Sequence, residues 1–578
     1  MSGAKQKARA SDAAAKQKAA VARPGAPWWP YAVALLVAVV AVFEVYGSAL
    51  HGPWFFDDTQ LPYTRPEFAD APLKAWIAGV RPVLMASFWL SFQQAGGENT
   101  FPYHFINILL HLLNGVLIYL VVRKVLHWAG NGDRMTREIL SFFGAGLFLL
   151  HPAQTESVSY VASRSETLSV FFVLSSFALF LYRRKNEIDF LTSIAVLALL
   201  GLGLLSKEHA AALVGVFVLT DYFWNPGFSI RGIRQNWRLY VLTLIGGAAA
   251  SVLIYRTLTA AATAGFGMKD LTWYQYFFSQ WRALVNYFRL FVFPLGQNLD
   301  YDFSSSKSIL DHGALFALAV LLAAISAAWL YRKRYPLISY GFFATLILFA
   351  PTSSIVPIRD LFVERRMYLP FIGLVLMTVG LLRCWKTQPT TLAIALSGVL
   401  VVEATLTYQR NLLWANPVDM WSDSVSKSPQ KPRPRFQLAY ADYQAGLCPQ
   451  AVAEFERTSH LQPPAYDLLL DWALAYDCAG NSNAAVEKLN QAAAIEPSAH
   501  VFSQIGMEYA KAGKYAEALD VLEKAGHFDP NFEMIYAYRG GVFEKLQKPE
   551  RAAEEYHHAL SIDSKNQMAL DGLRRLGR

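Results

Sequence analysis

The sequence contains little cysteine and little charge. It has 3 Cys in 578 residues, which excludes a disulfide scaffold and any zinc site built from four cysteines. Only 17% of the residues are Asp, Glu, Lys or Arg, while 54% are hydrophobic. This balance excludes a single soluble globular domain and indicates a polytopic membrane protein with a soluble portion.

The net charge is +8, and after residue 27 the sequence lacks a concentrated basic tract. Lys and Arg are scattered there among short loops between apolar runs, a pattern typical of membrane orientation and not of nucleic-acid binding. Residues 1–27 hold no compact apolar segment, and a signal peptide would have a shorter apolar core than the run that follows, with a small-residue cleavage site after it, so we expect residues 28–50 to be a retained span. We predict that residues 1–27 are a basic, disordered cytoplasmic tail.

Long apolar segments occupy most of the chain up to residue 410. About eleven of them can span a bilayer, and together they predict a helical membrane domain over 28–410. Loops such as Arg123-Lys124 and Arg332-Lys333-Arg334 fall on one side, which the positive-inside rule makes cytoplasmic. We therefore expect a multi-pass membrane protein with a cytoplasmic N-terminus and an extracytoplasmic C-terminal part. The expected spans are 28–50, 103–122, 139–151, 165–182, 190–206, 209–224, 239–256, 312–331, 337–351, 368–383 and 390–407.

Two adjacent carboxylates, Asp57 and Asp58, follow the first span. Charges beside a low-dielectric slab are costly unless they are paired, bound to a metal or used as a base. We expect Asp58 to be a general base, with Asp57 as the alternative or as an orienting neighbour. A helix cap or an ion pair with a nearby Arg is the competing interpretation.

A regular period begins near residue 431. Ala445-Gly446, Ala479-Gly480, Ala512-Gly513 and Leu546-Gln547 recur at intervals of 34, 33 and 34 residues. This period is that of tetratricopeptide repeats, in which small residues let paired helices approach. We predict a linker over 411–430 and an α-solenoid of about four repeats over 431–578. Its curved surface is suited to binding a protein.

Two of the cysteines, Cys448 and Cys478, lie in neighbouring repeats. They either form a disulfide in an oxidising compartment or remain two buried thiols. The sequence leaves both possibilities open.

Several motifs occur in order along residues 28–578, ahead of the repeats. They are Asp57-Asp58, Arg81-Pro82, Tyr103-His104-Phe105-Ile106-Asn107, Leu110-His111, His151-Pro152-Ala153-Gln154-Thr155-Glu156, Arg164, Ser206-Lys207-Glu208, Glu364-Arg365-Arg366-Met367-Tyr368-Leu369-Pro370 and Arg410-Asn411. The repeats alone would be unspecific. The ordered set resembles the transmembrane and tetratricopeptide-repeat O-mannosyltransferase family, a branch of the GT-C glycosyltransferases.

The resemblance implies an all-helical enzyme that moves mannose or another hexose from a polyprenyl-phosphate donor to a Ser or Thr hydroxyl of a protein, with inversion. Eukaryotic members of the family have more repeats, so the short array and compact loops suggest a bacterial member, which would lie in the inner (cytoplasmic) membrane. Its partners would be the lipid-linked donor, a protein acceptor held by the repeats, and membrane lipid. No nucleic acid and no certain cofactor are expected.

The resemblance also suggests roles for charged residues on one face of the membrane. Arg365, Arg366, Lys207 and Arg164 are the candidates for binding the donor phosphate, with structural ion pairs as the alternative for the Arg365-Arg366 pair and for Lys207. The candidates for sugar contacts or for supporting the base are Glu156, His151, Glu208 and Arg81; His151 could equally end a helix. Asp57, Asp58, Glu156 and His151 together could hold a divalent cation, although nothing in their spacing demands one.

Two other functions remain open. One is glycosyl transfer to a lipid or glycan, with the repeats recruiting an assembly partner. The other is a non-enzymatic membrane scaffold that presents the repeats. A scaffold gives no reason to gather acids and bases on one face of the membrane.

Overall fold

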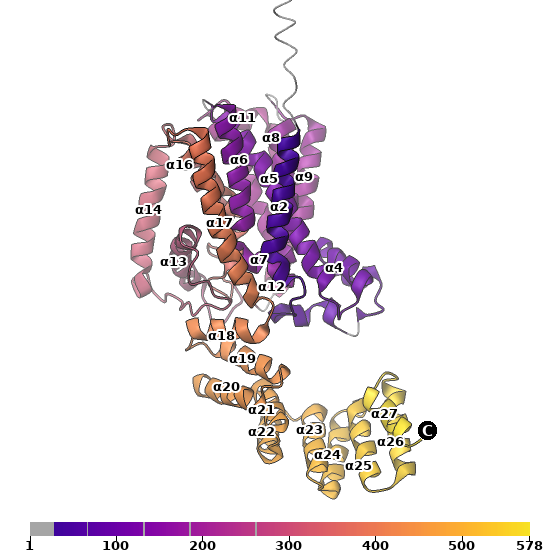
Figure 1. Cartoon of the computed structure of the whole chain (residues 1–578). Helices are drawn as coiled ribbons and strands as arrows, with labels where there is room; N and C mark the ends of the chain where they lie inside the picture. The colour runs from indigo at the N-terminus through magenta and orange to yellow at the C-terminus, as the bar shows by residue number, and fades with distance from the viewer. Residues whose placement is uncertain (1–27, 66–67, 131–132, 184–186, 261–262) are drawn as a thin grey trace, which may run out of the picture.

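A computed structural model describes residues 28–65, 68–130, 133–183, 187–260 and 263–578. The predicted tail, 1–27, lies outside these residues. Within them the chain is helical, and its one extended pairing is an isolated bridge between Ala264 and Ile358. Figure 1 shows a bundle of long helices with an arc of shorter helix pairs below it.

Each of the eleven apolar segments corresponds to a helix. Six of these helices, α2, α5, α8, α12, α14 and α17, are long and apolar enough to cross a membrane, while α9, α15 and α16 are shorter apolar helices. The total of about eleven spans therefore stays a prediction. The bounds are α2 (Trp29–Tyr46), α5 (Phe101–Trp128), α6 (Arg134–Leu150), α8 (Arg164–Arg183), α9 (Phe190–Leu204), α10 (Leu213–Trp224), α12 (Trp237–Ala260), α14 (Ala314–Leu330), α15 (Pro336–Phe349), α16 (Phe371–Leu382) and α17 (Pro389–Leu413).

Close helix contacts hold the bundle together beside the candidate site. Helices α15 and α16 approach so closely that a Cβ on Gly341 would lie 2.4 Å from the backbone nitrogen of Met377. Small residues permit this spacing, which brings the segment between the two helices against the rest of the bundle. That segment contains the Arg365-Arg366 pair.

The connecting segments at the lower end of the bundle in Figure 1 contain further helices, most of them short. We predict that segments 72–94 and 270–303, which contain helices α4 and α13, lie along the membrane surface. The bounds are η2 (Phe56–Gln60), α3 (Leu73–Trp76), α4 (Pro82–Ala95), η5 (Pro152–Gln154), α7 (Thr155–Ser159), η7 (Glu208–Ala212), α13 (Trp273–Val292) and η9 (Glu364–Met367).

The predicted repeats are four antiparallel helix pairs followed by α27 (Gln567–Arg575). Three of the turns inside the pairs use a glycine in the left-handed region, with φ of 73° at Gly446, 76° at Gly480 and 75° at Gly513. In the fourth turn Gln547 adopts φ 58° instead. The pairs are α19 (Pro432–Gln444) with α20 (Cys448–Leu461), α21 (Tyr466–Cys478) with α22 (Ser482–Ile495), α23 (Ala499–Lys511) with α24 (Tyr515–Phe528), and α25 (Glu533–Lys545) with α26 (Pro549–Ile562).

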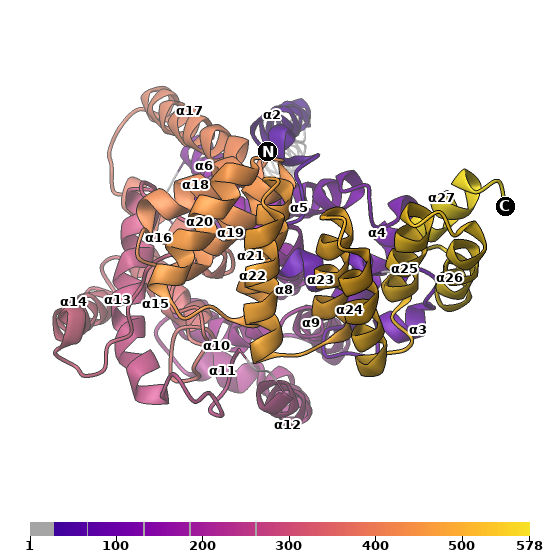
Figure 2. The ribbon, with the colours of Figure 1, turned by 90° about the horizontal axis from the view of Figure 1, so that it is seen from below.

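The predicted linker contains helix α18 (Pro417–Lys427). An apolar cluster joins this helix to the bundle and to the first repeat: Trp421 of α18 packs with Phe55, Tyr160, Trp414 and Leu438. Figure 2 shows α18 and α19 lying across the lower end of the bundle. The first repeat is therefore packed against the segments that contain the candidate site.

The structure joins Cys448 and Cys478 in a disulfide with a Cα–Cα distance of 5.6 Å and a sequence separation of 30 residues. Closing a loop of this length lowers the entropy of the unfolded chain, so Cys448→Ser is expected to lower the free energy of unfolding of the repeats by about 3–4 kcal/mol. Denaturant unfolding of the full chain, followed by circular dichroism, measures this change. Cys384→Ser, at the free and exposed cysteine, is the control, and equal losses in both variants would contradict the prediction.

Candidate active site

Asp58 is buried and its carboxylate organises the loop after α2. Oδ1 accepts hydrogen bonds from the Tyr63 hydroxyl at 3.0 Å and from the Ala162 amide at 2.8 Å. Oδ2 accepts from the Phe55 amide at 3.0 Å. Asp58 lines neither of the two cavities near it. These contacts match the competing interpretation of a local cap, because they tie the loop to the start of α8.

The protonation of Asp58 depends on its burial. Burial raises the pKa of Asp58 to about 7. The hydrogen bonds from Phe55, Tyr63 and Ala162 act to lower this pKa, and the negative charge of Asp57 acts to raise it further. Because the folded chain keeps this proton to a higher pH than the unfolded chain, Asp58 contributes stability that is fully present below about pH 4 and is lost as the pH rises to about 7.

We therefore expect the thermal unfolding midpoint of the wild-type protein to fall relative to that of Asp58→Asn as the pH rises through this window. Differential scanning fluorimetry in detergent measures both. Asp70→Asn, an exposed position on the same segment, should follow the wild type. If the unfolding midpoints of Asp58→Asn and the wild type changed with pH in parallel, the assignment of this titration to Asp58 would be contradicted.

Asp57 differs from Asp58 in being exposed. Its backbone amide donates to the Tyr160 hydroxyl at 2.9 Å. The preceding Phe56 has φ 44°, a strained conformation for a residue other than glycine. Its ring is held against Trp421 at 4.6 Å between centroids and faces the guanidinium of Arg433 at 5.5 Å. These contacts fix the turn that directs the Asp57 side chain away from the protein interior.

Two cavities meet at Asp57. The inner cavity, about 550 Å³, lies within the lower end of the bundle, and the outer cavity, about 1120 Å³, lies between the bundle and the first two repeats. Five residues line both cavities, namely Asp57, Thr263, Ile358, Arg365 and Arg366. One carboxylate and two guanidinium groups therefore stand at the junction.

The inner cavity contains most of the predicted cations. Lys207 and Arg81 line it together with Arg365 and Arg366, and apolar side chains such as Leu84 and Met85 complete its wall. Most of its positive groups form ion pairs with carboxylates. The cavity thus combines cationic and apolar surface, as a lipid phosphate would require.

Arg365 stands at the junction of the two cavities and lies beside two carboxylates. Its Nη1 lies 2.5 Å from Oε1 of the buried Glu156, whose Oε2 accepts from the Arg365 amide at 2.9 Å. Its Nη2 lies 3.8 Å from Oδ2 of Asp360. Burial acts to lower the pKa of Arg365, whereas the two carboxylates and Tyr160 act to raise it. The second effect is larger, so the pKa is raised and the guanidinium stays charged. Glu156 therefore orients Arg365.

Arg366 has a different environment. It donates to the carbonyl of Asp360 at 2.6 Å, to that of Leu361 at 3.3 Å and to the Tyr276 hydroxyl at 3.4 Å. Among the described residues it forms no ion pair with a carboxylate within 4.0 Å. Its charge is therefore the least compensated at the junction.

Two further ion pairs line the inner cavity. Lys207 bonds to Glu166, which also lies 3.4 Å from Nδ1 of His209. Arg81 binds Glu208 through two parallel bonds of 2.9 and 2.8 Å. Sequence reasoning did not single out Glu166, although its position two residues after Arg164 at the start of a helix was a signal available in the sequence.

Arg164 and His151 lie away from both cavities. Arg164 is fully buried and donates to Asn107, Ser87, Ser91 and Tyr103, so it ties α4 and α5 to α8. The His151 Nε2 lies 3.0 Å from the Phe291 carbonyl, and its Nδ1 accepts from the Ala153 amide at the end of α6. His151 thus occupies the helix-terminating position that was its alternative.

The four residues considered for a divalent cation do not converge. Asp58 is saturated by donors, Glu156 is paired with Arg365, and His151 bonds to backbone groups. Across the part of the chain that the structure describes, no group of three or more His, Cys, Asp or Glu side chains is arranged to hold a metal ion.

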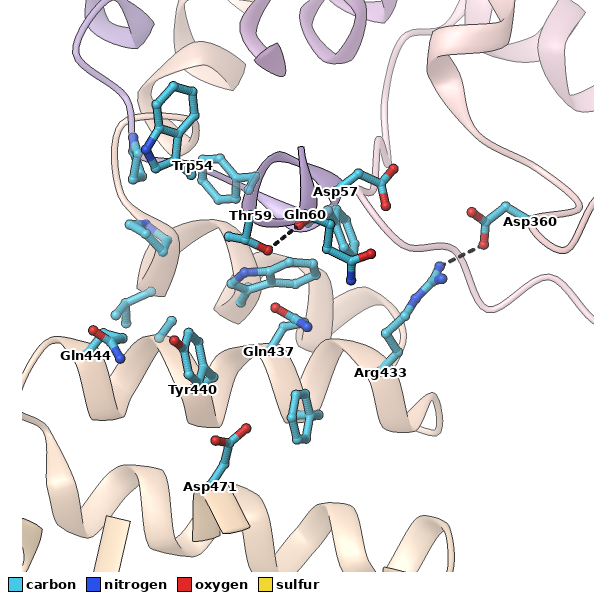
Figure 3. A pocket seen from close by; sticks show the side chains of 18 of the residues that line it. Trp54, Asp57, Thr59, Gln60, Asp360, Arg433, Gln437, Tyr440, Gln444 and Asp471 are labelled. Atoms are coloured by element: carbon cyan, nitrogen blue, oxygen red, sulfur yellow. Dashed lines mark hydrogen bonds and ion pairs between the residues drawn. The ribbon is translucent and has the colours of Figure 1, made fainter. Parts of the chain in front are cut away.

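The outer cavity has one wall from the bundle and one from the repeats (Figure 3). Trp54, Thr59 and Gln60 form the upper wall, and α19 and α21 form the lower one. The Asp57 carboxylate points toward the side where Arg433 and Asp360 are joined. Sequence reasoning missed this cavity because its upper wall, at residues 54–60, and its lower wall, at residues 433–471, are more than 350 positions apart in the sequence. The residues of the lower wall labelled in the figure are Arg433, Gln437, Tyr440, Gln444 and Asp471.

Comparison with known proteins places this geometry in context. No family model matches the sequence. It is 22% identical over 460 residues to the Caenorhabditis elegans protein O-mannosyl-transferase F38B6.6, covering 74% of this chain and 63% of that protein. It is 22% identical to mouse protein O-mannosyl-transferase TMTC3 over 92% of this chain and 64% of that protein, and 23% identical to human TMTC4 over 71% and 63%.

The chain is similar to protein O-mannosyl-transferases. It spans 63–64% of the length of these relatives. Among solved structures it resembles that of MamA, with 19% identity and a TM-score of 0.24 over 26% of this chain and 87% of that one. It also resembles YrrB, a TPR protein with an unusual peptide-binding site, with 17% identity and a TM-score of 0.24 over 31% and 90%.

Proposed function

We propose that this protein is a membrane glycosyltransferase that moves mannose or another hexose from a polyprenyl-phosphate donor to a Ser or Thr hydroxyl of a protein. The observation that carries this proposal is the junction of the two cavities, where Asp57 faces a space large enough for an acceptor and shares it with Arg365 and Arg366. The names of the relatives agree with it.

The donor would occupy the inner cavity. Its phosphate carries a negative charge that Arg365, Arg366 and Lys207 neutralise, and its polyprenyl chain suits the apolar wall near Leu84 and Met85. Entry of a phosphate would compete with Glu156 for Arg365 and with Glu166 for Lys207. Arg366, which donates to neutral groups, offers its charge without giving up an ion pair with a carboxylate.

The acceptor hydroxyl would approach from the outer cavity. The Asp57 carboxylate takes its proton as the oxygen attacks the anomeric carbon. The bond between that carbon and the phosphate oxygen breaks, and its electron pair leaves on the phosphate, where the cations stabilise the developing charge. Because acceptor and phosphate lie on opposite sides of the sugar, the anomeric configuration inverts. Asp58 positions Asp57 through the loop that its three hydrogen bonds hold.

The same proposal includes a topology. The repeats and both cavities would lie on the extracytoplasmic side of the inner membrane, with about eleven spans in a GT-C arrangement and a cytoplasmic N-terminus. The repeats would hold the acceptor protein over the outer cavity. Packing of α18 and α19 against the bundle supports this placement.

Glycoproteomics of extracytoplasmic proteins from cells with and without this chain tests the proposal, together with transfer from a polyprenyl-phosphate mannose to peptides by the purified protein. Loss of O-linked hexose from a set of proteins is the expected result. An unchanged glycan profile would count against protein O-glycosylation, and an altered glycolipid would favour the glycan or lipid acceptor.

A further inference from the structure

The first repeat contributes a charge to the site that the transfer mechanism above does not use. Arg433 is the second residue of α19, yet its guanidinium lines the outer cavity beside the bundle. Figure 3 shows it reaching from α19 to Asp360. The side chain is 38% exposed and lies over the ring of Phe56, the residue before Asp57.

Arg433 binds two carboxylates of the bundle. Its Nε and Nη2 lie 2.6 and 2.5 Å from the oxygens of Asp300, which is 2% exposed. Its Nη2 also donates to Oδ1 of Asp360 at 2.8 Å. Lys431 gives Asp300 a second cationic partner at 2.5 Å. Asp300 therefore keeps a counter-charge without Arg433, whereas Asp360 depends on Arg433 and Arg365.

Asp360 connects Arg433 to the donor site. Its Oδ1 accepts from Arg433, and its Oδ2 lies 3.8 Å from Nη2 of Arg365. Burial acts to raise the pKa of Asp360, but Arg433 and Arg365 outweigh it and hold the pKa below its ordinary value. Asp360 is thus an anion beside the guanidinium that the donor phosphate needs.

The carboxylates near Arg365 determine how strongly its guanidinium can attract a phosphate. Arg365 faces two carboxylates, Glu156 and Asp360, and one guanidinium cannot neutralise both and still attract an anion. With Arg433 bound to Asp360, Arg365 has one principal partner, Glu156. Without Arg433, Asp360 would close the 3.8 Å gap to Arg365 and compete with the phosphate.

We infer that Arg433 is a positioning residue of the transfer site: by holding Asp360 it keeps the charge of Arg365 available to the donor phosphate, so that the first repeat completes the donor site. This inference rests on the proposed function. It gives the repeats a second role beside acceptor binding.

The test measures binding of undecaprenyl phosphate, without sugar, to the full chain in nanodiscs by native mass spectrometry. Arg433→Ala is expected to weaken binding about tenfold, since one unit of charge compensation at a partly exposed anion site is lost. In the transfer assay the donor KM should rise while the acceptor KM is unchanged. Arg433→Gln removes the charge but keeps a donor toward Asp300, and it should behave in the same way.

Charge rescue distinguishes this role from a merely structural one. Adding Asp360→Asn to Arg433→Ala removes the carboxylate that was set free, so binding of undecaprenyl phosphate should return to near the wild-type value. Arg457→Ala, at a 62% exposed arginine of the same helix pair, is the matched control and should bind as the wild type does.

Unchanged binding in both Arg433 variants, or a double variant that binds no better than Arg433→Ala, would overturn the inference. Wild-type protein that neither binds undecaprenyl phosphate nor transfers sugar would instead remove the proposed function, and the inference with it. The two failures are therefore distinguishable.

Discussion

Replacing Asp57 by Asn is expected to lower the rate of sugar transfer by about two to four orders of magnitude, the contribution of a positioned general base. The amide has nearly the same shape as the carboxylate but cannot accept the proton of the acceptor hydroxyl. Because Asp57 is exposed and its backbone amide, not its carboxylate, bonds to Tyr160, the substitution leaves the loop intact. Single-turnover transfer to an acceptor peptide measures the loss.

Binding of undecaprenyl phosphate should be close to normal in Asp57→Asn, since the proposed phosphate contacts are Arg365, Arg366 and Lys207. Asp70→Asn, exposed on the same segment, is the matched control and should transfer at the wild-type rate. Asp58→Asn differs from both, because it is expected to alter stability and its pH dependence through the three hydrogen bonds to Asp58. Full activity in Asp57→Asn would exclude it as the base.

Replacing Arg365 by Ala is expected to lower kcat by about two to three orders of magnitude, as when one preorganised donor to a developing oxyanion is removed. The side chain stands at the junction of the cavities, 2.5 Å from Glu156, where the leaving phosphate would develop its charge. Steady-state transfer kinetics measure the change. Arg334→Ala, at an exposed arginine in the loop before α15, should leave kcat unchanged.

Loss of Arg365 also leaves the buried Glu156 without its counter-charge, which destabilises the fold. Arg365→Ala combined with Glu156→Gln removes both charges and is expected to recover the thermal unfolding midpoint without recovering transfer. A double variant that regains both stability and activity would show that Arg365 acts only through the fold.

The sequence predicted the helical architecture because its evidence was periodic and local. Apolar runs of bilayer length marked the helices, and the recurrence from Ala445-Gly446 to Leu546-Gln547 marked the repeats. The structure contains four helix pairs at this period, and a helix at each expected span. The bounds differ by only a few residues in most cases, because the strongest signals come from long segments.

The individual roles were harder to predict. Asp57 and Asp58 are neighbours in sequence, and the sequence favoured Asp58; the structure buries Asp58 among donors and exposes Asp57 to both cavities. Arg164 belongs to the ordered motifs, yet it holds helices together. Adjacent or conspicuous charges look alike in a sequence, since burial and partners depend on residues far along the chain.

By itself, the sequence determined that this is an all-helical protein with apolar helices, an acidic pair after the first of them and a helical array at its end, because these follow from hydrophobic period and composition. Only the tertiary structure decided which carboxylate faces the cavities, which cations are paired, and that Arg433 reaches Asp360 across 73 positions of sequence. Such pairings depend on how the helices dock, and docking brings together charges whose separation along the chain carries no signal.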